Sequence, residues 1–130
     1  MTGETNLETL LNNLNPVLNT GDFVFCTVPN MDKIELSQII GSFKEAEGIT
    51  LILSKAYADI IALEYSSIMS WITLQVHSSL EAVGLTAAFS KLLAVHNISC
   101  NVVAGYYHDH LFVMKEDAKK AMELLSDFNK

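Results

Sequence analysis

Gly84 marks the position in this chain where a ligand could approach the backbone most closely. It stands where a loop of small and polar residues meets a helical pattern that starts at Leu85. A glycine has no side chain to keep a ligand away, and the exposed N–H groups of a helix start attract a carboxylate. Glu81 in the same loop carries a charge suited to an ammonium group. In the alternative, structural interpretation, Ser78 and Glu81 form a capping box, and Gly84 lies inside the helix that they begin.

Three of the four histidines could meet at one end of a sheet. His77 closes one expected strand, and His108 and His110 stand two positions apart in another, so they share a face. If these strands are antiparallel neighbours, the three imidazoles could hold zinc or copper with an open coordination position. That arrangement depends on an assumed strand register, and a hydrogen-bonded structural role is the more common one. We therefore predict no metal site. If the protein did bind a metal ion, these three histidines would be the candidate ligands.

The remaining nucleophiles have no catalytic surroundings in the sequence. A reactive cysteine needs a nearby base and a lowered pKa, whereas Cys100 stands in an apolar strand, where a thiol acts as a small hydrophobic group. Ser78 follows His77 directly, but neighbours at a strand end face apart, and the sequence has no G-x-S-x-G motif. It also has no glycine-rich phosphate-binding motif. We expect a non-enzymatic protein without a cofactor.

The composition indicates a small and rather apolar protein. Of its 130 residues, 50% are hydrophobic and 18% are charged, and the net charge is −7. This charge disfavours nucleic acids and anionic membrane surfaces as partners, and no apolar run approaches the ~20 residues of a membrane-spanning helix. The start, MTGETNLETL, lacks the basic and apolar regions of a signal peptide. Because Cys26 and Cys100 lie far apart in apolar runs, we expect reduced thiols and a cytoplasmic protein.

The first half of the chain predicts two helices, a central strand and a hairpin. Leucines at i, i+3, i+4 and i+7 predict the first helix, and a strand that is apolar on both faces belongs in the middle of a sheet. Ser54 can cap a second, short helix with Tyr57, Ile60 and Ile61 on its inner side. The other expected segments are a helix over 5–14, a strand over 23–28 and a hairpin over 39–53.

The second half reads as strand, helix, strand, strand and helix. Residues alternate with period 2 over Trp71–Val76, and apolar residues follow helical spacing from Leu85, with Asn97 suited to a left-handed helix end. The later segments are strands over 98–104 and 108–114 and a helix from Ala118. A ferredoxin-like unit needs a fourth strand beside the first. We therefore expect the first half of the chain, or a second subunit, to cover the open edge of Trp71–Val76.

The second half, with its Gly–Leu helix start between a strand and a hairpin, resembles an ACT domain. This family is a small βαββαβ module that binds amino acids in metabolic regulators, and the resemblance covers 71–130 except for the final strand. The whole chain is similar to a group of small stand-alone bacterial proteins with two ACT-like lobes and no assigned activity. The matching segments are ETNLETLL, GDFVFCTVP, EAEGITLIL, ITLQVHSSLEAVGLTAAFSKLLA and ISCNVVAGYYHDHLFV.

The resemblance implies a fold and an organisation. The expected fold is α+β, with two ferredoxin-like (ACT-type, βαββαβ) lobes packed together, each an antiparallel sheet with helices on one face. The expected domains are a degenerate N-terminal ACT-like lobe over 1–66 and a C-terminal ACT domain over 67–130. A homodimer or higher homo-oligomer is expected, because ACT domains usually bind their ligands at a subunit interface.

The resemblance also implies a regulatory sensor that binds a small molecule, an amino acid, without catalysis. The alternatives are a metal-binding protein or small enzyme that uses the three histidines, and a purely structural interaction module. Ala82 and Val83 stand where many ACT loops carry an Asp or Asn and a Pro. The corresponding N-terminal loop, Pro29–Lys33, lacks the Gly–Leu helix start and is expected to be empty. The implied ligand-binding residues are Ser78, Ser79, Leu80, Glu81, Ala82, Val83, Gly84 and Leu85.

Overall fold

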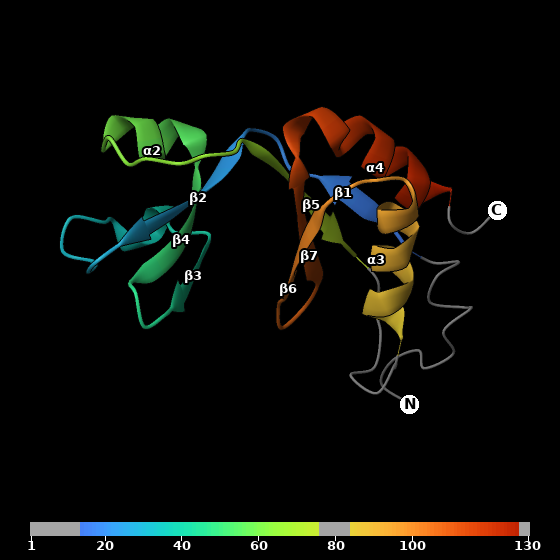
Figure 1. Cartoon of the computed structure of the whole chain (residues 1–130), viewed down its shortest axis with the longest axis horizontal. Coiled ribbons are helices and arrows are strands. Elements are labelled where there is room, and N and C mark those ends of the chain that lie inside the picture. Colours follow the sequence, from blue (N-terminus) through green and yellow to red (C-terminus); the bar gives the residue numbers. More distant parts are fainter. Residues whose placement is uncertain (1–13, 76–83, 128–130) are drawn as a thin grey trace. The chain divides into compact units, whose positions relative to one another are not determined.

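The chain divides into two compact units (Figure 1). The structure is a computed structural model and describes residues 14–75 and 84–127. Thr20–Met69 forms one unit, which we call the insert unit. Met1–Asn19 and Ser70–Lys130 form the other, the main unit, which is therefore discontinuous in sequence. The predicted helix over 5–14 lies outside the described residues, apart from its last position.

The insert unit contains an antiparallel sheet in the order β3-β4-β2. β2 and β4 pair along their whole length, from Phe23 opposite Ser54 to Val28 opposite Ile49. Alternate residues of these strands, with Ala58, form its core. The predicted strand over 23–28 and the predicted hairpin are confirmed, but β4, and not β2, is the middle strand of this unit. The elements are β2 (Phe23–Val28), the 3-10 helix η1 (Leu36–Gln38), β3 (Gly41–Lys44), β4 (Ile49–Ser54) and α2 (Lys55–Ile60).

Ser54 begins the short helix α2 as predicted. Its hydroxyl accepts a hydrogen bond from the backbone N–H of Tyr57 at 3.1 Å. The predicted inner side of α2 is wrong at Ile60, which is 79% exposed, whereas Ala58 is fully buried. The reason is geometric: two residues along a helix rotate a side chain by about 200°, so Ala58 and Ile60 cannot share a face.

The main unit contains strands in the order β1-β5-β7-β6, with α3 and α4 on one side of the sheet (Figure 1). β6 and β7 form an antiparallel hairpin in which Val103 lies opposite His110. This is the α+β, ferredoxin-like architecture that the sequence predicts. The elements are β1 (Pro16–Leu18), β5 (Met69–Leu74), α3 (Leu85–Val95), β6 (Cys100–Ala104), β7 (Asp109–Met114), the 3-10 helix η2 (Lys115–Asp117) and α4 (Ala118–Ser126).

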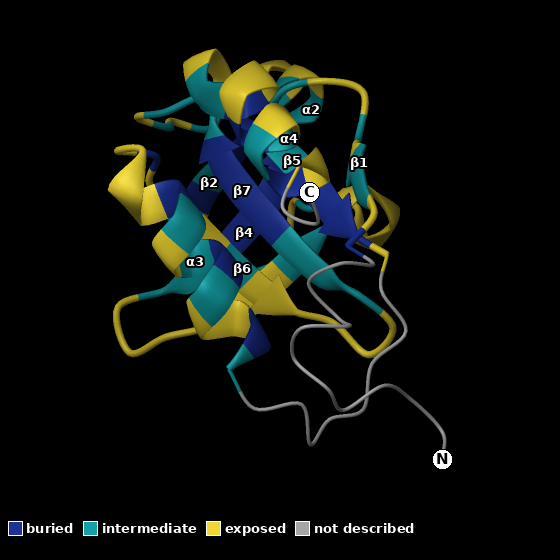
Figure 2. Ribbon diagram, turned by 90° about the vertical axis from the view of Figure 1, so that its right-hand side faces the viewer, coloured by how far each residue is buried: buried dark blue, intermediate teal, exposed yellow. Residues whose placement is uncertain are grey.

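The core of the main unit lies between its sheet and its two helices. Alternate residues of β5 and β7 point towards the helices, which present residues at helical spacing. Figure 2 shows β7 largely in the buried colour, whereas α3 carries exposed residues on its outer side. The side chains exposed by 1% or less in this core are Ile72, Leu74, Leu111, Val113, Phe89, Leu93, Ala121 and Leu125.

The strand that the sequence did not reveal is β1. It pairs antiparallel with β5, with Val17 opposite Thr73, and so covers the edge that was expected to need a partner. Backbone hydrogen bonds continue the ladder on both sides, from Asn19 N–H to the Trp71 carbonyl and from Gln75 N–H to the Asn15 carbonyl. The first half of the chain thus supplies the fourth strand of the ferredoxin-like unit.

Candidate functional site

Gly84 lies at the start of α3 in a conformation that favours glycine. Its φ and ψ are 94° and −6°, in the left-handed region, and no side chain caps the helix at this position. α3 begins at Leu85, so Gly84 is the residue before the helix. Gly84 therefore does not lie inside α3, as the structural alternative expected, and Ser78 and Glu81 lie outside the described residues. A side chain at Gly84 would strain the backbone.

The first turn of α3 is anchored by its neighbours. Leu85 is only 5% exposed and belongs to the core of the main unit. The Gly84 carbonyl accepts the first helical hydrogen bond, from the Ala88 N–H at 2.9 Å. The first N–H groups of an α-helix have no acceptor within the helix and carry part of the positive end of its dipole. The other predicted ligand-binding residues, 78–83, lie outside the described residues.

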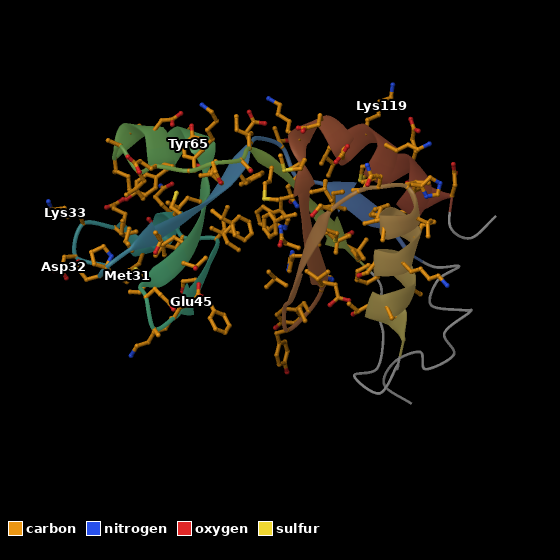
Figure 3. All side chains as sticks on the ribbon, viewed as in Figure 1. Met31, Asp32, Lys33, Glu45, Tyr65 and Lys119 are labelled. Atoms are coloured by element: carbon orange, nitrogen blue, oxygen red, sulfur yellow. The ribbon has the colours of Figure 1, made fainter. Side chains whose placement is uncertain are left out.

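The corresponding loop of the insert unit uses its backbone donors locally. The Asn30 side chain accepts from the Asp32 N–H at 3.0 Å, and the Met31 carbonyl accepts from the Ile34 N–H at 3.0 Å. The Glu35 N–H donates to the Tyr57 hydroxyl at 2.9 Å. Figure 3 labels Met31 and Asp32 on this loop. These three backbone donors therefore already have acceptors within the unit.

Two of the three candidate histidines lie close together on the β6–β7 hairpin. The rings of His108 and His110 are 6.5 Å apart between centroids, and Nδ1 of His110 accepts a hydrogen bond from Nε1 of Trp71 at 3.0 Å. On its other side, Nε2 of His110 lies 3.1 Å from where a Cβ at Gly105 would stand. The hydrogen bond from Trp71 therefore holds the His110 ring in place.

No group of three His, Cys, Asp or Glu residues that could hold a metal ion occurs within residues 14–75 and 84–127. His77 lies outside those residues. The described part of the chain thus contributes at most a pair of histidines, one of which already uses Nδ1 as an acceptor.

The two cysteines are free thiols. Cys26 is buried, and Cys100 is half-buried against the core of the main unit. Burial raises the pKa of Cys100 to about 11. At neutral pH this residue is therefore a protonated thiol, in agreement with its predicted role as a small hydrophobic group.

A polar cluster on α2 was not apparent in the sequence. Nζ of Lys55 lies 2.7 Å from Oδ2 of Asp59, and the Tyr65 hydroxyl donates to Oδ1 of Asp59 at 2.7 Å. Figure 3 shows Tyr65 beside α2. The hydrogen bonds from Lys55 and then Tyr65 lower the pKa of Asp59. Because these groups are exposed, their pairing contributes little to stability. Lys55 and Asp59, but not Tyr65, line an open pocket of about 390 Å³ whose walls are Thr20, Gly21, Asp22, Phe23, Ser54, Lys55, Ala56 and Asp59.

None of the helices in the described part of the chain is both long enough and apolar enough to cross a membrane.

Solved structures share this arrangement. A Vibrio cholerae protein of unknown function, described as a possible transport protein, is 51% identical with a TM-score of 0.87, covering 95% of this chain and 96% of that one. A protein from Agrobacterium tumefaciens is 16% identical with a TM-score of 0.71, covering 89% of each chain. Aspartokinase III from E. coli, solved with aspartate and ADP, is 11% identical with a TM-score of 0.62, and the match covers 89% of this chain and 34% of that one. The likenesses at low identity show the fold alone.

Sequence comparison gives the family directly. No curated protein matches the chain. Two models of the ACT domain family match it, one over residues 2–70 and the other over residues 66–127. The first match alone covers more than half of the 130 residues. The chain therefore belongs to the ACT domain family.

Proposed function

We propose that this protein is a non-enzymatic regulatory protein that binds an amino acid at residues 78–85. The observation that carries the proposal is the left-handed Gly84, which precedes α3 without a side-chain cap. Two ACT domain matches support a regulatory role. One structural neighbour, aspartokinase III from E. coli, was solved in complex with aspartate, which supports an amino acid as the ligand class.

The proposed binding mode follows from charge. The α-carboxylate of the ligand accepts hydrogen bonds from the first N–H groups of α3, where the helix dipole favours an anion. Glu81 pairs with the α-ammonium group. The absence of a Cβ at Gly84 lets the carboxylate reach the backbone. A zwitterion satisfies both ends of this site, whereas a simple anion or cation satisfies one.

In this proposal the protein works as a homodimer or higher homo-oligomer in the cytoplasm. Ligand binding favours one conformation of residues 78–85 and so changes the surface offered to a partner. The local hydrogen bonds of the loop after β2 support one site per chain, in the main unit.

The test is a calorimetric and thermal-shift screen against the twenty amino acids at millimolar concentration. A ligand should raise the melting temperature of the wild-type protein in a concentration-dependent way. Gly84→Ala should weaken binding at least about tenfold, because an alanine is strained at this φ and its methyl group obstructs the carboxylate.

Gly21→Ala provides the matched control. Gly21 is also left-handed, with φ of 111°, but it lies in the insert unit. Both variants should lose about 1–2 kcal/mol of stability from backbone strain, and only Gly84→Ala should lose the ligand. Silence of the wild-type protein towards all twenty amino acids would contradict the proposal.

A further inference from the structure

The imidazole of His110 faces two hydrogen-bonding side chains on β5, the neighbouring strand. Nε1 of Trp71 lies 3.0 Å from Nδ1 of His110, and Oγ1 of Thr73 lies 3.3 Å from the same nitrogen. The two rings are also in contact, with centroids 5.7 Å apart. One nitrogen of His110 thus has two possible partners at almost equal distance.

The chemistry of Trp71 fixes the neutral tautomer of His110. An indole N–H can donate a hydrogen bond but cannot accept one. Nδ1 of His110 must therefore be the acceptor, and the proton of the neutral ring lies on Nε2. A protonated ring carries a hydrogen on Nδ1 as well, so this nitrogen has no lone pair left to accept from the indole N–H.

Thr73 can take over as the partner of the protonated ring. A hydroxyl oxygen has two lone pairs, and Oγ1 of Thr73 accepts one hydrogen bond from Nδ2 of Asn19 at 3.0 Å. The second lone pair can accept from Nδ1 of a protonated His110. Asn19 is itself held in place because its side chain and its backbone N–H both donate to the Trp71 carbonyl, at 3.1 and 2.9 Å.

We propose that His110 is a proton-operated switch in the main unit, which accepts from Trp71 when neutral and donates to Thr73 when protonated. Protonation releases the indole N–H of Trp71 from its acceptor. The two states differ in one proton and in the hydrogen-bond partner, and they need no rearrangement of the strands.

The surroundings of His110 set the pH range of the switch. The charged or titratable groups next to it are Asp109, at the start of its own strand, and His108, in the turn before that strand. The side chains facing it from β5 are the uncharged Trp71 and Thr73, and its partner on β6 is Val103. Burial lowers the pKa of His110 below 6.5, the charge of His108 lowers it further, and Asp109 opposes them. The switch therefore operates below the pH at which an ordinary histidine takes up its proton.

Trp71 is the only tryptophan in the chain, so its fluorescence reports on this contact directly. The emission should be followed from about pH 8 to about pH 4.5, with far-ultraviolet circular dichroism as the measure of folding. We expect one transition with a midpoint below 6.5 while the circular dichroism stays constant. In His110→Gln, which keeps a polar side chain but does not titrate, this transition should disappear.

Two further variants test whether the transition comes from the exchange of partners at His110 or only from the titration of a histidine near Trp71. Thr73→Val removes the acceptor of the protonated ring, so it should move the midpoint to lower pH. His96→Gln should change nothing, since His96 is exposed at the end of α3 and lies against the Leu92 carbonyl. The indole N–H resonance of the wild-type protein gives a second readout that needs no variant, and it should shift with the same midpoint.

The proposal is overturned if the wild-type indole resonance does not move over this pH range. It is also overturned if the fluorescence transition survives in a folded His110→Gln, or if Thr73→Val keeps the wild-type midpoint.

Discussion

Individual residues determine what this protein can do chemically, and Cys100 is an example of a group that is kept inactive. Burial holds its pKa at about 11, so the thiolate that reacts with electrophiles is a fraction of about 10⁻³ at pH 8. A disulfide reagent should therefore label native Cys100 slowly at pH 8, and about ten times faster for each unit of higher pH until about pH 11. Denatured protein should react at once.

Cys26→Ser should be used for this measurement, because Cys26 is also a free thiol. Fast labelling of native Cys100 at pH 8 would show that its thiol is more accessible than the structure indicates.

Phe89 belongs to the core of the main unit. It is fully buried between the sheet and the helices, and it is among the largest side chains there. Phe89→Ala should lower the free energy of unfolding by roughly 3–5 kcal/mol, since it removes a large apolar surface and leaves a cavity. Urea denaturation measures this loss. Val95→Ala, at an exposed position of the same helix, should change stability by less than about 0.5 kcal/mol.

At the scale of elements, the sequence predicts what is encoded locally. The capping serine at Ser54 and the left-handed Asn97, with φ of 62°, were predictable because each signal lies within a few residues of the helix end it marks. Gly84 was likewise predictable as a helix-start residue. β1 was not, because it has only three residues, begins with a proline and follows an expected helix stop.

The contacts around His110 could not be predicted either, for a related reason. Trp71 and His110 are 39 positions apart, and their contact depends on the register of two strands. The only sequence signal is that Trp71 and Thr73 lie two positions apart in one expected strand, as do His108 and His110 in another, so each pair shares a face. That signal is common, and it specifies no pairing.

The pairing of β1 with β5 can be tested with two proline substitutions. Backbone hydrogen bonds join Asn19 to Trp71 and Asn15 to Gln75. In this antiparallel register, the backbone N–H and C=O groups of the odd-numbered residues therefore point towards β5. Val17→Pro therefore removes a donor of the ladder and should cost at least about 1 kcal/mol of stability. Leu18→Pro removes an N–H that points away from β5 and should cost less. Equal losses in the two variants would contradict the pairing.

At the scale of the whole molecule, protonation of His110 links stability to pH. Its pKa in the folded protein is lowered from 6.5, so the unfolded chain binds the proton more tightly. Its contribution to stability is therefore complete above pH 6.5 and is lost as the pH falls from there towards the folded-state pKa. The contribution of Asp109 to stability has the opposite sign. Burial raises its pKa above 3.8, so the folded protein binds this proton more tightly than the unfolded chain and gains stability as the pH falls.

Urea denaturation at two pH values tests this linkage. Between about pH 7.5 and about pH 5.5, the wild-type protein should lose more stability than His110→Gln. An equal loss in the two proteins would assign the pH dependence to other groups.

The discontinuous main unit has a consequence for synthesis on the ribosome. β1 leaves the exit tunnel first, but β5 begins only at Met69 and β7 only at Asp109. The insert unit, contiguous from Thr20 to Met69, can fold in the meantime, because domains fold as units during translation. β1 must therefore wait as an unpaired segment until β5 has emerged. In a polysome it can meanwhile meet β5 of a neighbouring nascent copy, so slow translation before Leu74 favours strand exchange between molecules.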